Sequence, residues 1–165
     1  MSMDQSANHV LQKIIDHVPA DKCQFIVDEM CSGSSMDQII CNKFGCRVVQ
    51  FCVEKLAPFA KSNGNDGNLS IETKLIRKML EKISRKAYTY CQDEFANYII
   101  QYIIKTRCLS FYKDRIISKS LRGNIVALSQ AKYSSHVMEQ AFEFANYDAL
   151  LQLVEEVFNG LVNTN

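Results

Sequence analysis

Apolar residues recur along the chain in clusters with helical spacing, and short polar stretches separate the clusters. Three of these clusters each place four apolar residues on one stripe of a helix, and such a stripe normally faces a protein core. We therefore expect all of these side chains to be buried. The stripes consist of Val10, Leu11, Ile14 and Ile15; Val48, Val49, Cys52 and Val53; and Ile99, Ile100, Ile103 and Ile104.

The same pattern contains an internal repeat, because four segments align without gaps. They read QSANHVLQKII, KFGCRVVQFCV, EFANYIIQYII and KYSSHVMEQAF, and their core motifs open at Asn8, Cys46, Asn97 and Ser135. The opening residues are separated by 38, 51 and 38 positions. We assign the longer interval to an insertion at about residues 57–69, which contains SNGNDGN. We expect it to be a disordered loop, and the alternative is a site for a partner.

Each repeat is expected to hold three helices, which predicts an all-α fold of stacked repeats. A short first helix carries Met36, Ile39 and Ile40, then Ala87, Tyr90 and Cys91, then Ile125, Leu128 and Ser129. The aligned segment forms the second helix. The third helix is expected at about residues 20–31, 70–82, 110–121 and 146–158.

The repeats are expected to occupy residues 1–32, 33–83, 84–122 and 123–159 of a single array. Residues 160–165 resemble the start of a further repeat, and the first repeat lacks room for its short helix, so we expect both ends to be cut from a longer array. Glycine just past an apolar run indicates the end of a helix. That signal recurs at Gly33, Gly123 and Gly160, with Ser84 in the same column. Pro19 suits the first turn of a helix, and Ser70 suits an N-cap.

Two columns of the second helix are unusual for a solvated surface. The first and fifth motif residues lie four positions apart and therefore share a face of the helix. We call them the edge pairs: Asn8/Gln12, Cys46/Gln50, Asn97/Gln101 and Ser135/Glu139. The second motif residue is always flat, and we call His9, Arg47, Tyr98 and His136 the planar residues. A flat group beside two hydrogen-bonding side chains suits the recognition of an unpaired base.

Composition limits the chemistry further. Lys and Arg number 19 against 18 Asp and Glu, so a nucleic acid would have to be held by stacking and base edges more than by phosphate neutralisation. The seven cysteines are odd in number and include no Cys-x-x-Cys pair, which favours reduced core thiols over disulfides or zinc. His9, His17 and His136 lack metal-ligand spacing, and no phosphate-binding loop occurs. We therefore expect neither an enzyme nor a metal or other cofactor, and no membrane span.

The motifs NHVLQ, CRVVQ, NYIIQ and SHVME resemble the base-reading motifs of the PUF (Pumilio-like) family, in the order usually found in its fourth to seventh repeats. The resemblance covers almost the whole chain outside the insertion. It implies an α-solenoid of three-helix PUF repeats, which is an armadillo-like superhelix. It also implies that the edge pairs contact RNA base edges and that the planar residues stack on the bases.

In that family Asn with Gln favours uracil, Cys or Ser with Gln favours adenine, and Ser with Glu favours guanine. Because PUF arrays read RNA antiparallel to the chain, the resemblance implies a 5′-GUAU-3′ core. It further implies binding to messenger RNA 3′UTRs, translational repression in the cytoplasm and protein co-repressors as partners, with no DNA ligand. The alternative is an armadillo- or HEAT-like scaffold that grips an extended peptide and reads no RNA.

Overall fold

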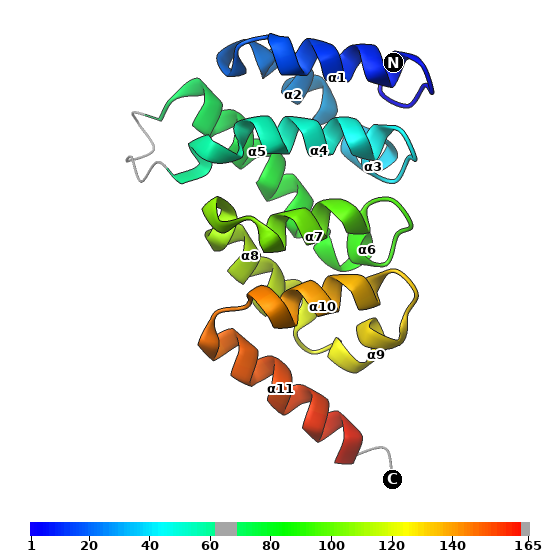
Figure 1. Cartoon of the computed structure of the whole chain (residues 1–165), viewed down its shortest axis with the longest axis vertical. Helices are drawn as coiled ribbons and strands as arrows, with labels where there is room; N and C mark the ends of the chain where they lie inside the picture. Colours follow the sequence, from blue (N-terminus) through cyan, green and yellow to red (C-terminus); the bar gives the residue numbers. More distant parts are fainter. Residues whose placement is uncertain (62–68, 163–165) are drawn as a thin grey trace. The chain divides into compact units, whose positions relative to one another are not determined.

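The computed structural model describes residues 1–61 and 69–162, and every element in this part of the chain is a helix (Figure 1). The expected all-α fold is therefore confirmed. The chain divides into two compact units, Met1–Arg85 and Lys86–Asn165. We call them unit 1 and unit 2 and describe each by itself.

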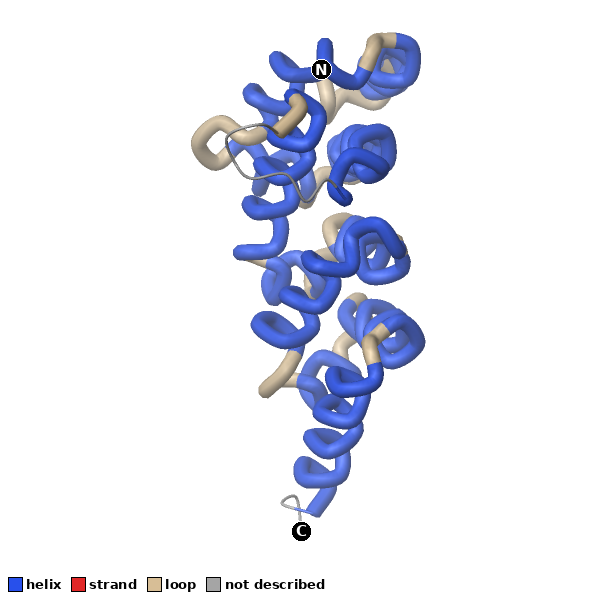
Figure 2. Tube along the Cα trace, turned by 90° about the vertical axis from the view of Figure 1, so that its left-hand side faces the viewer, coloured by secondary structure: helices blue, strands red, loops and turns tan. Residues whose placement is uncertain are grey.

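Unit 1 contains two successive copies of the aligned motif. Its helices are α1 (Ala7–His17), the 3-10 helix η1 (Ala20–Cys23), α2 (Gln24–Met30), α3 (Ser35–Ile40), α4 (Gly45–Leu56), the 3-10 helix η2 (Ala57–Lys61) and α5 (Ile71–Arg85). The helix α4 is central, because it packs against α1, α3, α5 and η2. The third helices, α2 and α5, lie behind α1 and α4 in Figure 1, and the side view of Figure 2 separates these two layers.

Unit 2 repeats this plan. Its helices are α6 (Ala87–Cys91), α7 (Asn97–Lys105), the 3-10 helix η4 (Arg107–Leu109), α8 (Ser110–Ile116), a π-helical turn η5 (Ile117–Leu121), α9 (Ile125–Gln130), α10 (Ser134–Phe144) and α11 (Tyr147–Val162). The helix α7 packs against α10, α6 and α8. We refer to α1, α4, α7 and α10, which carry the four aligned motifs, as the motif helices.

The apolar stripes of α4 and α7 are buried as expected, but the stripe of α1 is only partly so. Val48 and Val49 on α4 are inaccessible to solvent, whereas Val10 is 55% exposed and Ile14 is 39% exposed. The expectation of burial was therefore wrong for these two residues. The cause is the arrangement of the helices, since α4 covers the other side of α1, where Ile15 is fully buried.

The segment expected to be a disordered insertion begins with a helix. Residues 57–61 form η2, Ala57 is buried, and the Thr73 hydroxyl of α5 donates to the Phe59 carbonyl oxygen at 3.0 Å. The Ser70 hydroxyl accepts from the Thr73 backbone N–H at 3.2 Å, so the expected N-cap of α5 is confirmed. The loop prediction was wrong for residues 57–61, and residues 62–68 lie outside the described part of the chain.

Two of the three glycines in the expected column follow helix ends with left-handed backbone. Gly33 has φ of 44° and Gly123 has φ of 86°, a conformation that suits glycine because it lacks a Cβ atom. Gly160 differs, since α11 continues through it to Val162. The expectation that Gly160 ends its helix was wrong.

All seven cysteines are thiols, and five of them are buried. Burial raises the pKa of the Cys52 thiol to about 12, and the neighbouring Cys23 and Cys31 thiols add to the shift. Because the thiolate is the reactive form, iodoacetamide at pH 8.5 is expected to leave Cys52 unmodified in the folded protein. The half-buried Cys41 and Cys108 should be alkylated first, and all seven should react in denaturant. Mass spectrometry that finds Cys52 modified as fast as Cys108 would contradict this expectation.

Candidate nucleic-acid interface

A side-chain cap holds the turn that leads into three of the four motif helices. Before α7, Asp93 Oδ1 accepts from the backbone N–H groups of Phe95 and Ala96 at 2.9 and 2.8 Å. Asp4 makes the same pair of bonds before α1, and Asn42 makes it before α4. The bonds from Ala7 and Ser6 also lower the pKa of Asp4. The equivalent position before α10 is Ala131, whose side chain has no oxygen that could accept such bonds.

These turns fix the asparagines of two edge pairs. Asn97 is 2% exposed, and its Nδ2 donates to the carbonyl oxygens of Asp93 and Glu94 at 2.8 and 2.9 Å. Both amide hydrogens are thereby used, so only Oδ1 remains, and it accepts from Gln101 Nε2 at 2.8 Å.

The edge pair of α1 has the same arrangement. Asn8 donates to the carbonyl oxygens of Asp4 and Gln5, and its Oδ1 accepts from Gln12 Nε2 at 2.8 Å. Both pairs therefore share a helix face, as expected. Their asparagines are buried, however, and the half-buried glutamines are the more accessible members.

The edge pair of α4 is built differently. Cys46 is buried, and its Sγ lies 3.3 Å from the Lys43 carbonyl oxygen. The half-buried Gln50 donates from Nε2 to Glu54 Oε1 at 2.7 Å. The amide of Gln50 is therefore held by Glu54, one turn further along the helix. The alignment of the four repeats did not single out Glu54.

The edge pair of α10 combines a hydroxyl with an exposed carboxylate. The Ser135 hydroxyl donates to the Lys132 carbonyl oxygen at 3.3 Å. The Glu139 side chain is 70% exposed, and its Oε2 lies 3.7 Å from His136 Nδ1. Two acceptor oxygens are thus accessible at a position where the other motif helices carry an amide.

The planar residues are exposed on all four motif helices. Tyr98, for example, is 57% exposed, although the neighbouring Ile99 and Ile100 are buried. An exposed flat side chain next to a fixed polar pair is the geometry that base stacking requires. Within each unit, α1 packs against α4 and α7 packs against α10, so each unit brings together two such sets.

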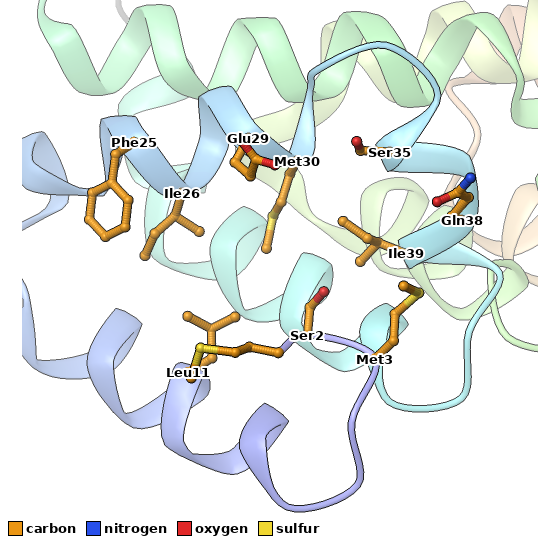
Figure 3. Close-up of a pocket in the computed structure, with 11 residues that line it drawn as sticks. Ser2, Met3, Leu11, Phe25, Ile26, Glu29, Met30, Ser35, Gln38 and Ile39 are labelled. Carbon is orange, nitrogen blue, oxygen red and sulfur yellow. The ribbon is translucent and has the colours of Figure 1, made fainter.

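A separate pocket of about 360 Å³ opens in unit 1 between α1, α2 and α3 (Figure 3). Its lining is mainly apolar, with Leu11 from α1 across the space from Phe25, Ile26 and Met30 of α2, and with Ile39 from α3. None of the edge pairs or planar residues lines it. The pocket therefore lies apart from the candidate interface.

Other classes of site find no support in the described residues. Across residues 1–61 and 69–162, no three His, Cys, Asp or Glu side chains are grouped so that they could hold a metal ion. Among the helices of the same ranges, none has both the length and the apolar character needed to cross a bilayer. In the described residues, polar side chains recur in register on the motif helices and in the turns that precede them.

Comparison with known proteins defines the class as helical RNA-binding repeats. The model of the Pumilio-family RNA binding repeat (PUF) matches four stretches, residues 1–31, 36–58, 86–119 and 124–158. The chain therefore belongs to the Pumilio (PUF) family. This is a family of RNA-binding proteins and not of enzymes.

Similar proteins share both sequence and fold with the chain. Fem-3 mRNA-binding factor 2 of Caenorhabditis elegans is 35% identical over 161 residues, which make up 97% of this chain and 26% of that protein. Pumilio domain-containing protein 6 of the same organism is 37% identical over 98% of this chain and 33% of that protein. The crystal structure of PUF-6 in complex with 5BE13 RNA matches 96% of this chain and 43% of that chain. The sequence identity is 37%, and the TM-score is 0.86. The chain thus spans about a quarter to a third of these curated relatives, and the expected PUF solenoid fold is confirmed.

Proposed function

We propose that the chain binds single-stranded RNA in a sequence-specific manner and reads about one base with each motif helix. The observation that carries the proposal is the repeated set of one exposed planar residue beside one ordered edge pair. Stacking on a planar residue contributes about 1–3 kcal/mol per base for any base. The edge pairs supply the discrimination that stacking lacks.

The proposed core is 5′-GUAU-3′, read from α10 back to α1. On α10, the accessible carboxylate of Glu139 accepts hydrogen bonds and therefore suits the two N–H donors of guanine. On α7 and α1, Gln101 and Gln12 form hydrogen bonds with the edge of uracil, each beside its asparagine. On α4, Gln50 serves adenine, and Cys46 adds apolar contact.

The biological setting that we propose follows that of the family's messenger RNA regulators. Fem-3 mRNA-binding factor 2 is named for binding a messenger RNA. By analogy, the target is a 3′UTR element, the outcome is post-transcriptional repression in the cytoplasm, and co-repressor proteins are recruited. Each of these statements concerns the whole protein and requires its own test.

A binding titration tests the proposed recognition. A labelled RNA containing UGUAUAU is compared, at one fixed salt concentration, with the same RNA in which UGU is changed to ACA. The change removes the proposed guanine and its neighbouring uracil, so the affinity is expected to fall by roughly tenfold or more. Equal affinities, or no binding to either RNA, would favour a peptide-gripping scaffold instead.

A further inference from the structure

Two glutamines at equivalent positions hold their amides in opposite directions along the helix. On α7, Gln101 Nε2 donates to Asn97 Oδ1, one turn toward the start of the helix. On α4, Gln50 Nε2 donates to Glu54 Oε1, one turn toward the end of the helix. Gln101 therefore directs its nitrogen toward the helix start, and Gln50 directs its oxygen there.

The chemistry of each partner fixes these directions. Asn97 gives both amide hydrogens to backbone carbonyl oxygens and can offer only Oδ1 to its neighbour. The carboxylate of Glu54 accepts hydrogen bonds and has none to donate. Each partner must therefore bind the nitrogen end of the glutamine, and the two amides are reversed relative to each other.

The first motif residue decides which partner is used. On α1, Asp16 lies one turn after Gln12, at the position equivalent to Glu54, yet Gln12 donates to Asn8. An asparagine with a committed amide thus holds the glutamine nitrogen toward the helix start. A cysteine is a weak acceptor, so Cys46 leaves the glutamine of α4 to Glu54.

The Watson–Crick edges of uracil and adenine are reversed in the same sense. Uracil presents the O4 acceptor followed by the N3–H donor, whereas adenine presents the N6–H donor followed by the N1 acceptor. For bases that enter in the same orientation, an amide with its nitrogen at the O4 position pairs with uracil. The reversed amide pairs with adenine. Cytosine has the order of adenine and therefore places donor against donor and acceptor against acceptor in a uracil site.

We propose that Glu54 is a positioning residue that makes α4 select adenine, because it holds the amide of Gln50 in the direction opposite to that of Gln101. Asn8 and Asn97 have the converse role on α1 and α7, where they set the direction that selects uracil. This inference rests on the proposed RNA binding and assigns the base preference to the direction of the amide. The glutamine itself is common to all three helices.

The test measures the affinities of the intact protein for RNAs that carry adenine or uracil at the position assigned to α4. Replacement Glu54→Ala is expected to lower the ratio of adenine to uracil affinity by about tenfold, since the fixed direction of a bidentate contact is lost. Replacement Glu54→Gln retains an acceptor oxygen and is expected to keep most of the ratio. Lys105 stands at the equivalent position of α7, where Gln101 is held by Asn97. Lys105→Ala is therefore the matched control and should leave the uracil preference of α7 unchanged.

The outcomes separate this inference from the proposed function. If the unmodified protein binds RNA without preferring adenine at that position, the assignment of α4 is wrong. If it prefers adenine and Glu54→Ala keeps the ratio, the positioning role is wrong. An equal loss of affinity for both bases would also overturn it, because that result indicates a purely structural contribution. Circular dichroism spectra that match the unmodified protein confirm that each variant is folded.

Discussion

Replacement Glu139→Gln is expected to convert the guanine preference of α10 into a preference for adenine. The exposed carboxylate offers two acceptors to the N1–H and N2–H donors of guanine, whereas an amide would place its own N–H group against one of them. Affinity for guanine-containing RNA should fall by about 1–3 kcal/mol, which is roughly 5- to 150-fold. Adenine at that position should become the better base.

Fluorescence anisotropy with four RNAs that differ only at this base measures the change. Glu143→Gln, one turn further along α10, removes the same charge at another exposed position and is the matched control. Because salt alters every affinity through the phosphates, all titrations use one ionic strength. A guanine preference that survives Glu139→Gln would show that Glu139 does not read the base.

Replacement Gly45→Ala is expected to destabilise unit 1 strongly. A Cβ atom at Gly45 would lie 2.3 Å from the backbone oxygen of Ile39 and 3.0 Å from its carbonyl carbon. A backbone group cannot move aside as a flexible side chain can, so α3 and α4 would have to separate. We expect a loss of about 1–3 kcal/mol in the free energy of unfolding, as for other overpacked core positions.

Thermal unfolding followed by circular dichroism measures this loss as a lower Tm. The exposed replacement Gln38→Ala on α3 is the control and should change stability by no more than about 0.5 kcal/mol. The matched positions of the other three motif helices, Ala7, Ala96 and Ser134, already carry a Cβ atom. An unchanged Tm for Gly45→Ala would show that the α3–α4 contact relaxes at little cost.

The helices were predictable because the repeat supplies the same information several times. Three of the four motif helices show a clear apolar stripe, and the short helices were located by residues such as Met36 and Tyr90, which are buried. Single deviations were harder to predict. Val10 belongs to the same sequence column as Val48, and only the position of α4 on the other side of α1 distinguishes them.

The sequence predicted which residues of the candidate site share a helix face, but it did not predict the hydrogen bonds that they make. The spacing of the edge pairs correctly placed Asn97 and Gln101 on one face, yet spacing does not show that the asparagine amide is committed to backbone carbonyls. The capping column of Asp4, Asn42 and Asp93 was visible in the sequence, four residues before the start of three of the four motifs, and was overlooked. Glu54 was not singled out, because its column changes to Asp16 on α1 and to Lys105 on α7, and a glutamate recurs only as Glu143 on α10.

The motif residues of one repeat cannot simply be exchanged for those of another, because the turns that precede the motif helices differ. The turn before α10 carries Ala131 where the turn before α7 carries Asp93, whose cap orders the carbonyl groups that bind the Asn97 amide. A variant of α10 that carries the equivalents of Asn97, Tyr98 and Gln101 would have the base-contacting side chains. It would lack the capped turn that orients the asparagine. Reprogramming α10 for uracil therefore calls for a fourth substitution, Ala131→Asp, outside the trio itself.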